Sequence, residues 1–177
     1  MLNHPLLKSL SGGDLRSIGA SNQVVTEVLA QPDLISVLFN GVESSDPVIR
    51  MRCADVIEKV SAMHPELLLP FKNTILQRLT KVQQQEVRWH VAAILPRLPL
   101  TKAEVNSVVN VLLSFTNDRS SIVKTMSMQA LADIAMQHQH LRPSIKQHIE
   151  ELTQTGTPAM QARGKKLLKA LSKESQS

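Results

Sequence analysis

The chain has 177 residues, enough for one domain with a real core or for one short repeat array. Hydrophobic residues make up 42% of it and charged residues 20%, which is too apolar for a disordered chain. With three Phe, one Trp and no Tyr, the core must be built from aliphatic side chains, which suits packed helices better than a β-sandwich.

The charge balance is mildly basic, with 20 Lys and Arg residues against 15 Asp and Glu residues. This balance permits an acidic partner without requiring nucleic acid. The single cysteine, Cys53, rules out an internal disulfide and fits a reducing compartment. The N-terminal segment lacks the basic start of a signal peptide, and no apolar run is long enough to span a bilayer. We therefore expect a cytoplasmic protein that does not enter a membrane.

Helical spacing of apolar residues, at i, i+3, i+4 and i+7, dominates the chain, and no stretch alternates as a strand does. Residues 1–31 are predicted to form a loop followed by a capping helix, and the tail at 173–177 is predicted to fray. Asp46 followed by Pro47 is a typical helix start, and Pro96 should kink or end its helix early. Helices are predicted at 22–31, 32–44, 46–63, 65–81, 84–98, 101–117, 119–137, 141–154 and 157–172.

A repeat of about 37 residues underlies this pattern. The anchor positions are Arg50, Arg88, Lys124 and Gln161, spaced by 38, 36 and 37 residues. Four other offsets are apolar in every copy: Ile49, Val87, Val123 and Met160; Ile57, Leu95, Leu131 and Leu168; Val60, Leu98, Ile134 and Leu171; Leu38, Leu76, Leu112 and Ile149. The repeat predicts four helical hairpins over an array at 32–172, namely 32–63, 65–98, 101–137 and 141–172.

Residues 46–50, Asp-Pro-Val-Ile-Arg, followed by Ala54, resemble the Asp-Pro-x-Val-Arg signature that opens the second helix of a HEAT repeat. Residues 86–92 and 117–124 are partial copies, and the fourth copy departs from the signature with Gln161 and Gly164. The chain therefore resembles the HEAT-repeat (armadillo-type) family and looks like a small bacterial member of it. The resemblance implies an all-α, right-handed α-α superhelix of about four hairpins, an N-terminal capping helix and a concave binding face formed by the second helices.

Positions one, two, five and nine residues after each anchor avoid the apolar columns and should point into that concave groove or along its edge. The binding candidates among them are Met51, Arg52, Asp55, Trp89, His90, Arg97, Met126, Gln129, Arg163 and Lys166. Trp89, the only tryptophan, has two interpretations: an exposed anchor for a partner, or a wedge between adjacent hairpins.

Two sets of basic residues also allow two interpretations each. The ladder of Arg50, Arg88 and Lys124 is expected to bind a turn carboxylate or backbone carbonyl of the adjacent repeat; the alternative is a basic strip for phosphates or acidic peptides. The second set is a cluster near the C-terminus, interpreted as a solvated face that complements the helix dipole or as a binding patch. Its members are Arg163, Lys165, Lys166, Lys169 and Lys173.

Catalytic and metal chemistry has weak support in the sequence. His138, His140 and His148 lack cysteine partners and fall across a helix end, so no metal site is predicted. Cys53 shares a column of small residues with Val91 and is expected to be a core thiol. We therefore assign no catalytic residue and no cofactor, and we expect a protein that is not an enzyme.

The leading functional hypothesis is a scaffold that binds a protein or peptide, with an acidic partner fitting the charge. The alternative is a nucleic-acid groove like that of the HEAT-like DNA glycosylases, which needs aromatic residues and a carboxylate among basic residues; here only Trp89 and Asp133 could serve. A third hypothesis, an accessory subunit of a chromophore lyase, has no residue to carry its chemistry.

Overall fold

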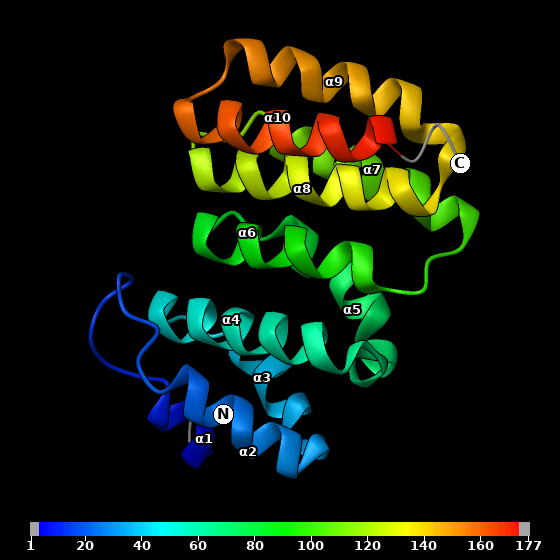
Figure 1. Ribbon diagram of the computed structural model, residues 1–177. Helices are drawn as coiled ribbons and strands as arrows, with labels where there is room; N and C mark the ends of the chain where they lie inside the picture. Colours follow the sequence, from blue (N-terminus) through cyan, green and yellow to red (C-terminus); the bar gives the residue numbers. More distant parts are fainter. Residues whose placement is uncertain (1–3, 174–177) are drawn as a thin grey trace. The chain divides into compact units, whose positions relative to one another are not determined.

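The computed structural model describes residues 4–173, and over these residues the protein is all α-helical (Figure 1). No strand occurs in this part of the chain. The ten α-helices are α1 (Pro5–Ser9), α2 (Ser21–Ala30), α3 (Ile35–Gly41), α4 (Pro47–Met63), α5 (Lys72–Gln77), α6 (Gln85–Ile94), α7 (Lys102–Phe115), α8 (Ser121–Gln137), α9 (Arg142–Thr155) and α10 (Pro158–Lys173).

Short 3-10 segments explain most differences from the predicted helices. The helix predicted at 32–44 begins as a 3-10 turn at Pro32–Leu34 and becomes α3. The helix predicted at 65–81 is split into a 3-10 segment at Pro65–Phe71, α5 and a last 3-10 turn at Leu79–Lys81. Pro70, which the prediction overlooked, lies inside the first of these segments and cannot donate an α-helical hydrogen bond. The short helix α1 was not predicted.

The residues that were predicted to start or end helices do so in the structure. The carboxylate of Asp46 accepts a hydrogen bond from the backbone N–H of Val48 at 2.8 Å, which makes Asp46 the N-cap of α4. The α-helix α6 ends at Ile94, and Pro96 lies in the 3-10 turn that follows. Lys173 is the last residue of α10; the rest of the tail predicted to fray lies outside the described residues.

The chain divides into two compact units, one through Pro99 and the other from Leu100. In the first, α4 packs against α2, α3 and α6; in the second, α8 packs against α7, α9 and α10. The boundary coincides with the predicted turn between the second and third hairpins. That the four hairpins continue as one superhelix stays a prediction.

The apolar columns of the repeat form the core of each unit. Of their sixteen members, only Leu76 and Leu168 are not fully buried. The position that precedes the anchor is buried in all four copies, as Ile49, Val87, Val123 and Met160. Burying such side chains stabilises a fold by about 1.5–3 kcal/mol each. The periodicity therefore identifies the core correctly.

The anchor arginines Arg50 and Arg88 bind turns. One guanidinium nitrogen of Arg50 donates to the carbonyls of Ser44 and Ser45 at 2.8 and 3.0 Å, and its Nε donates to the Gln84 amide oxygen at 2.7 Å. The Nε of Arg88 donates to the carbonyl of Val82 at 2.9 Å. These two arginines thus have a structural role, but the expectation that their carbonyl partners lie in the adjacent repeat is wrong, because these carbonyls belong to the turn of the arginine's own hairpin; the bond from Arg50 to Gln84, by contrast, reaches the next hairpin.

None of the helices within residues 4–173 combines the length and apolar character needed to cross a bilayer.

Cys53 is a core thiol, as predicted. It is fully buried, and a Cβ added at Gly41 would collide with its sulfur and with Leu7. The other members of its column, Val91, Ser127 and Gly164, are buried too. Burial raises the pKa of the Cys53 thiol to about 12, because the interior disfavours the charged thiolate.

We expect Cys53 of the folded protein to react with a thiol reagent such as DTNB at pH 8 roughly a thousandfold more slowly than Cys53 of the protein unfolded in urea, since both the thiolate fraction and access are reduced. Absorbance at the released thiolate's band measures both rates. Rapid labelling of the folded protein would contradict a buried thiol.

Candidate interaction surface

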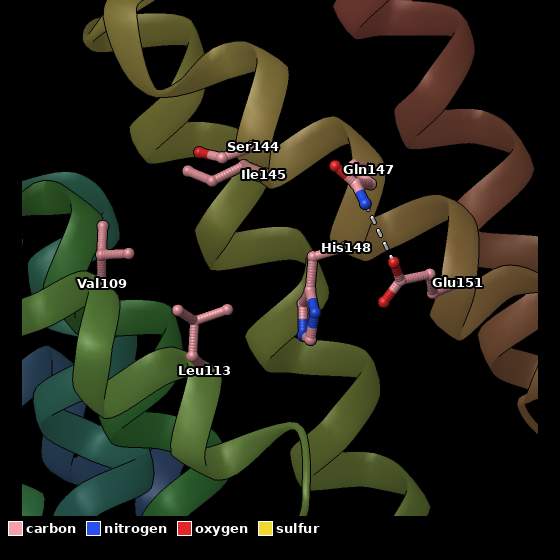
Figure 2. A pocket seen from close by; sticks show the side chains of 7 residues that line it. All are labelled: Val109, Leu113, Ser144, Ile145, Gln147, His148 and Glu151. Carbon is pink, nitrogen blue, oxygen red and sulfur yellow. Dashed lines mark hydrogen bonds between the residues drawn. The ribbon is translucent and has the colours of Figure 1, made fainter.

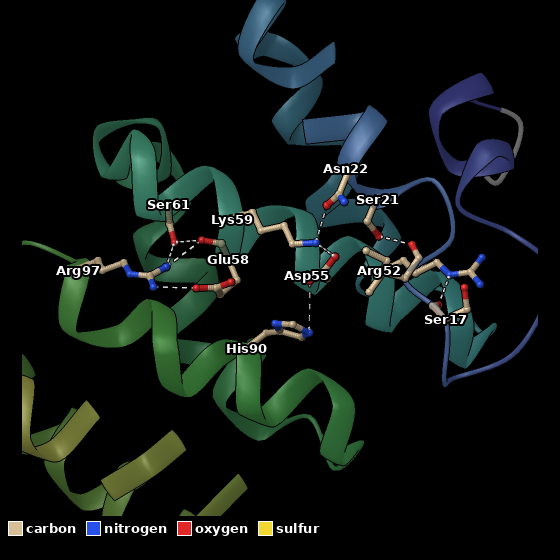
Figure 3. A network of polar contacts seen from close by, with 11 residues as sticks. Ser17, Ser21, Asn22, Arg52, Asp55, Glu58, Lys59, Ser61, His90 and Arg97 are labelled. Atoms are coloured by element: carbon tan, nitrogen blue, oxygen red, sulfur yellow. Dashed lines mark hydrogen bonds and ion pairs between the residues drawn. The ribbon is translucent and has the colours of Figure 1, made fainter. Parts of the chain in front are cut away.

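Arg52 on α4 holds the loop of residues 11–20 against the first unit (Figure 3). Its guanidinium is only 3% exposed, and every recorded hydrogen bond goes to a backbone carbonyl. The acceptors are Leu10 at 2.9 Å, Ser11 at 3.3 Å, Gly12 at 2.7 Å, Asp14 at 3.5 Å and Ser17 at 3.0 Å. One cation thus satisfies carbonyls that the loop cannot pair within itself.

Glycines allow the loop to approach this closely. Gly12, Gly13 and Gly19 all have positive φ, between 52° and 75°, a region that other residues seldom adopt. A Cβ at Gly19 would lie 2.7 Å from Cζ of Arg52, so only glycine fits there. The result is a loop with an ordered backbone whose side chains Leu15 and Ile18 remain exposed to solvent, at 38% and 44%.

The prediction that Arg52 points into an open groove is therefore wrong. The same holds for Met51 and Asp55, which are 4% and 5% exposed. The reason is that α4 is a central helix: α2, α3 and α6 surround it, and the 11–20 loop covers part of the remaining face. The repeat periodicity places these side chains opposite the apolar columns but cannot reveal what the N-terminal segment covers.

Asp55 forms the centre of a second polar cluster. Its Oδ2 accepts a hydrogen bond from Lys59 Nζ at 2.7 Å, and the same ammonium donates to Asn22 of α2 at 2.9 Å. His90 of α6 lies on the other side, with its Nε2 4.0 Å from Asp55 Oδ1 (Figure 3). The cluster thus links α2, α4 and α6 through one buried carboxylate.

Burial lowers the pKa of the His90 imidazole below its ordinary value, although the carboxylates of Asp55 and Glu58 act in the opposite direction. The nearby ammonium of Lys59 adds to the lowering. His90 is therefore neutral at pH 7, and it acts as a packed polar side chain of the first unit and not as an additional positive charge.

Arg97, in the 3-10 turn after α6, is also engaged within the protein. Its two terminal nitrogens bind the Glu58 carboxylate at 2.7 Å and the Glu58 carbonyl and Ser61 hydroxyl at 2.8 Å each. These bonds fasten the end of α6 to the last turns of α4. Arg97 is half-buried and joins the two helices.

Trp89 lies half-buried on α6 beside His90. The two rings meet edge to face, with centroids 5.7 Å apart and an interplanar angle of 61°. On its other sides, no ring contact or hydrogen bond of Trp89 with the described residues is seen. Its partial exposure leaves both interpretations, partner anchor and packing wedge, in place.

In the second unit, the predicted residues form a shorter chain of contacts. Arg163 of α10 donates to the side-chain oxygen of Gln129 at 2.7 Å, and Gln129 donates to Asp133 at 2.8 Å. Met126 is half-buried. Lys166 is the only one of the ten sequence-predicted binding residues that is fully exposed.

Two pockets were not predicted from the sequence. A pocket of about 490 Å³ in the first unit is lined by Pro32, Asp33, Ile35, Ser36, Glu66, Leu67, Pro70 and Phe71. A second, of about 270 Å³, lies between α7 and α9 and is lined by Val109, Leu113, Ser144, Ile145, Gln147, His148 and Glu151 (Figure 2). Both lie beside the first helices of hairpins, whereas the repeat predicts binding residues on the second helices.

The three histidines that came nearest to a metal pattern make different contacts. His148 pairs with the Thr116 hydroxyl at 3.0 Å, whereas the rings of His138 and His140 meet each other edge to face at 6.2 Å. Within residues 4–173, no group of three His, Cys, Asp or Glu side chains is placed to hold a metal ion.

Comparisons with models of known protein families, with curated protein sequences and with solved structures find no match to this chain. The geometry of the two units and the repeat in the sequence are therefore the basis for any functional proposal.

Replacing Arg52 with Met should lower the free energy of unfolding by about 2–4 kcal/mol, because several carbonyls lose a charged donor. The loop should also open, so trypsin should cleave after Arg16 faster in the variant. Urea unfolding and timed proteolysis measure the two effects. Arg78→Met, at a surface pair with Glu43 whose arginine side chain is 64% exposed, is the control and should change stability by less than about 0.5 kcal/mol. Unchanged cleavage at Arg16 would show that Arg52 does not hold the loop.

His90 should make the protein less stable in mild acid. The unfolded chain takes up a proton at His90 near pH 6.5, whereas the folded imidazole, whose pKa is lowered, does so only at lower pH. The unfolded state therefore binds more protons as the pH falls below about 6.5, and the free energy of unfolding decreases. We expect His90→Gln to flatten this decrease between about pH 7.5 and 5.5 in urea titrations. His140→Gln, which changes an exposed histidine outside this cluster, is the matched control, and an equal flattening in both variants would contradict a specific role of His90.

Proposed function

We propose that this protein is a non-catalytic scaffold of the HEAT-like type that binds a protein or peptide partner along the second helices of its hairpins. The repeat at four equivalent positions, with its buried columns, supports a stacked-hairpin architecture. A scaffold of this kind binds through a rigid surface that loses little conformational freedom on association.

The observation that carries the proposal is the partial exposure of Trp89, the only tryptophan of the chain, on α6 beside His90. His90 packs against its ring, Asp55 and Lys59 are bonded to each other, and Arg97 is bonded to Glu58. A partly exposed tryptophan is typical of the anchors that dominate protein interfaces. The candidate surface of the first unit therefore centres on Trp89, whereas Met51, Arg52 and Asp55 are buried and are not available to a partner.

A nucleic-acid groove draws less support from these contacts. The three arginines among the predicted binding residues, Arg52, Arg97 and Arg163, all donate to acceptors within the protein. Among the aromatic residues, Phe39 and Phe71 stack on each other with ring centroids 4.2 Å apart. Base stacking would therefore depend on Trp89 alone.

The test uses the full chain as bait for cross-linking and affinity purification from its native cytoplasm, followed by measurement of Kd for each recovered protein. Trp89→Ala should weaken a true partner by roughly 30-fold, since anchors of this kind contribute about 2 kcal/mol or more. Leu69→Ala removes an exposed apolar side chain, 49% exposed on a different segment, and should leave Kd nearly unchanged.

Trp89 fluorescence distinguishes the two interpretations independently of any partner. A red-shifted emission that iodide quenches readily supports the anchor. A blue-shifted, shielded emission together with an unchanged Kd in Trp89→Ala would identify Trp89 as packing and would falsify this surface as the binding site.

A further inference from the structure

The net charge of the protein is concentrated on α10. This helix contains five of the 20 basic residues and none of the 15 acidic residues, while the other 15 basic residues balance the acidic ones. The formal charge of +5 is therefore equal to the charge of these 16 residues. A charge confined to one helix produces a local field that the overall composition conceals.

Four lysines share one face of α10. At about 100° per residue, they fall within roughly 100° of the helix circumference. They are Lys165, Lys166, Lys169 and Lys173, and all four are exposed. The buried row of α10 lies on the opposite side: Met160, Gly164, Leu167 and Leu171. The helix α10 thus packs against α8 and α9, and its four lysines are exposed to solvent.

The fifth cation, Arg163, differs from these four. It is half-buried, and its guanidinium donates to Gln129 of α8. Within residues 4–173, no ion pair involves any of the four lysines. The lysine face, defined as Lys165, Lys166, Lys169 and Lys173, therefore carries charge that the described part of the protein does not neutralise.

Stability of the helix does not account for the lysine face. The helix dipole acts within the last turn, so it explains Lys173 but not Lys165 or Lys166. Like charges three and four residues apart destabilise a helix, and Lys169 stands at these spacings from the other three lysines. The mutual repulsion of these lysines therefore lowers the stability of α10.

Solubility of a terminal helix does not account for it either. A polar surface of mixed charge serves that purpose, and the neighbouring helix α9 has one, with Lys146 beside the exposed Glu150 and Glu151. The single sign of charge on α10 points instead to a ligand of opposite sign.

We propose that the lysine face of α10 binds an acidic segment of a protein partner, a helix or extended stretch with Asp or Glu on one side. This proposal rests on the proposed scaffold function and specifies the chemistry of the partner. Flexible ammonium groups suit carboxylates at variable positions. The small side chain of Ala162, on the same face, lets a partner's backbone come close. No aromatic residue on α10 offers a stacking surface for unpaired bases, which favours a peptide over single-stranded nucleic acid.

The test measures binding of a fluorescent synthetic helical peptide with Glu at positions i, i+3 and i+7 and Ala elsewhere, by anisotropy at low salt. The variant Lys165→Glu, Lys166→Glu, Lys169→Glu should weaken binding about tenfold or more. The control Lys81→Glu, Lys102→Glu, Arg119→Glu changes three exposed cations elsewhere and alters the net charge equally. The control should weaken binding by less than about threefold. The milder variant with Gln at 165, 166 and 169 repeats the test without charge reversal, and circular dichroism checks that each protein is folded.

Equal losses in the lysine-face variant and the control would reduce the binding to overall charge and overturn the proposal. A DNA duplex of equal charge that binds more tightly than the peptide, and loses binding in the lysine-face variant, would assign the lysine face to nucleic acid. That result would also overturn the proposal. A native partner that is lost in Trp89→Ala but retained in the lysine-face variant would leave the scaffold function standing without this inference. A partner whose binding changes in neither variant would contradict both the proposed Trp89 surface and the proposed role of the lysine face.

Discussion

The hydrogen bonds of Arg52 determine how the N-terminal part of the protein is built. The loop of residues 11–20 has almost no buried side chains, so hydrophobic burial alone cannot hold it. One guanidinium, donating to carbonyls from Leu10 to Ser17, replaces the hydrogen bonds that water would otherwise supply. Because those carbonyls converge on one point, the loop must turn sharply, and glycine at 12, 13 and 19 makes the turns available. The helix that follows the loop, α2, packs against α4.

This arrangement changes the role of α4. The repeat predicts that Met51, Arg52 and Asp55 line a groove, but all three side chains are buried. Arg52 donates to carbonyls of the loop, and Asp55 accepts from Lys59, which also donates to Asn22 of α2. A buried polar network of this kind is costly when any member lacks a partner, so it restricts α2, α4 and α6 to one arrangement. Of the predicted binding residues in the first unit, those on α4 are buried, whereas Trp89 on α6 is partly exposed.

The helices and the core could be predicted from the sequence because both depend on local periodicity. Ile57 and Leu131, for example, are buried for the same reason at equivalent places in two hairpins. The candidate site depends on contacts between residues far apart in the chain, such as Arg52 with Gly12 or Arg97 with Glu58, and periodicity contains no information about them. An arginine opposite an apolar column is equally consistent with an open groove and with a covering loop. The glycine pair at 12 and 13 was the available signal, since paired glycines allow a loop to fold closely over a buried donor.

The two units also differ in whether their positive side chains are bonded within the protein or exposed to solvent. In the first unit most arginines bond to carbonyls or carboxylates, so positive charge is used to join segments, as Arg50, Arg52 and Arg97 do. In the second unit the excess is carried by lysines, whose hydrated ammonium groups remain in solvent on α10. If the two proposals hold, the arginine bonds would preorganise the first unit around Trp89, whereas the exposed ammonium groups of α10 would attract an acidic segment over a longer, salt-dependent range. A rim charge of this kind changes mainly the association rate and its salt dependence, whereas truncating a packed anchor changes mainly the dissociation rate.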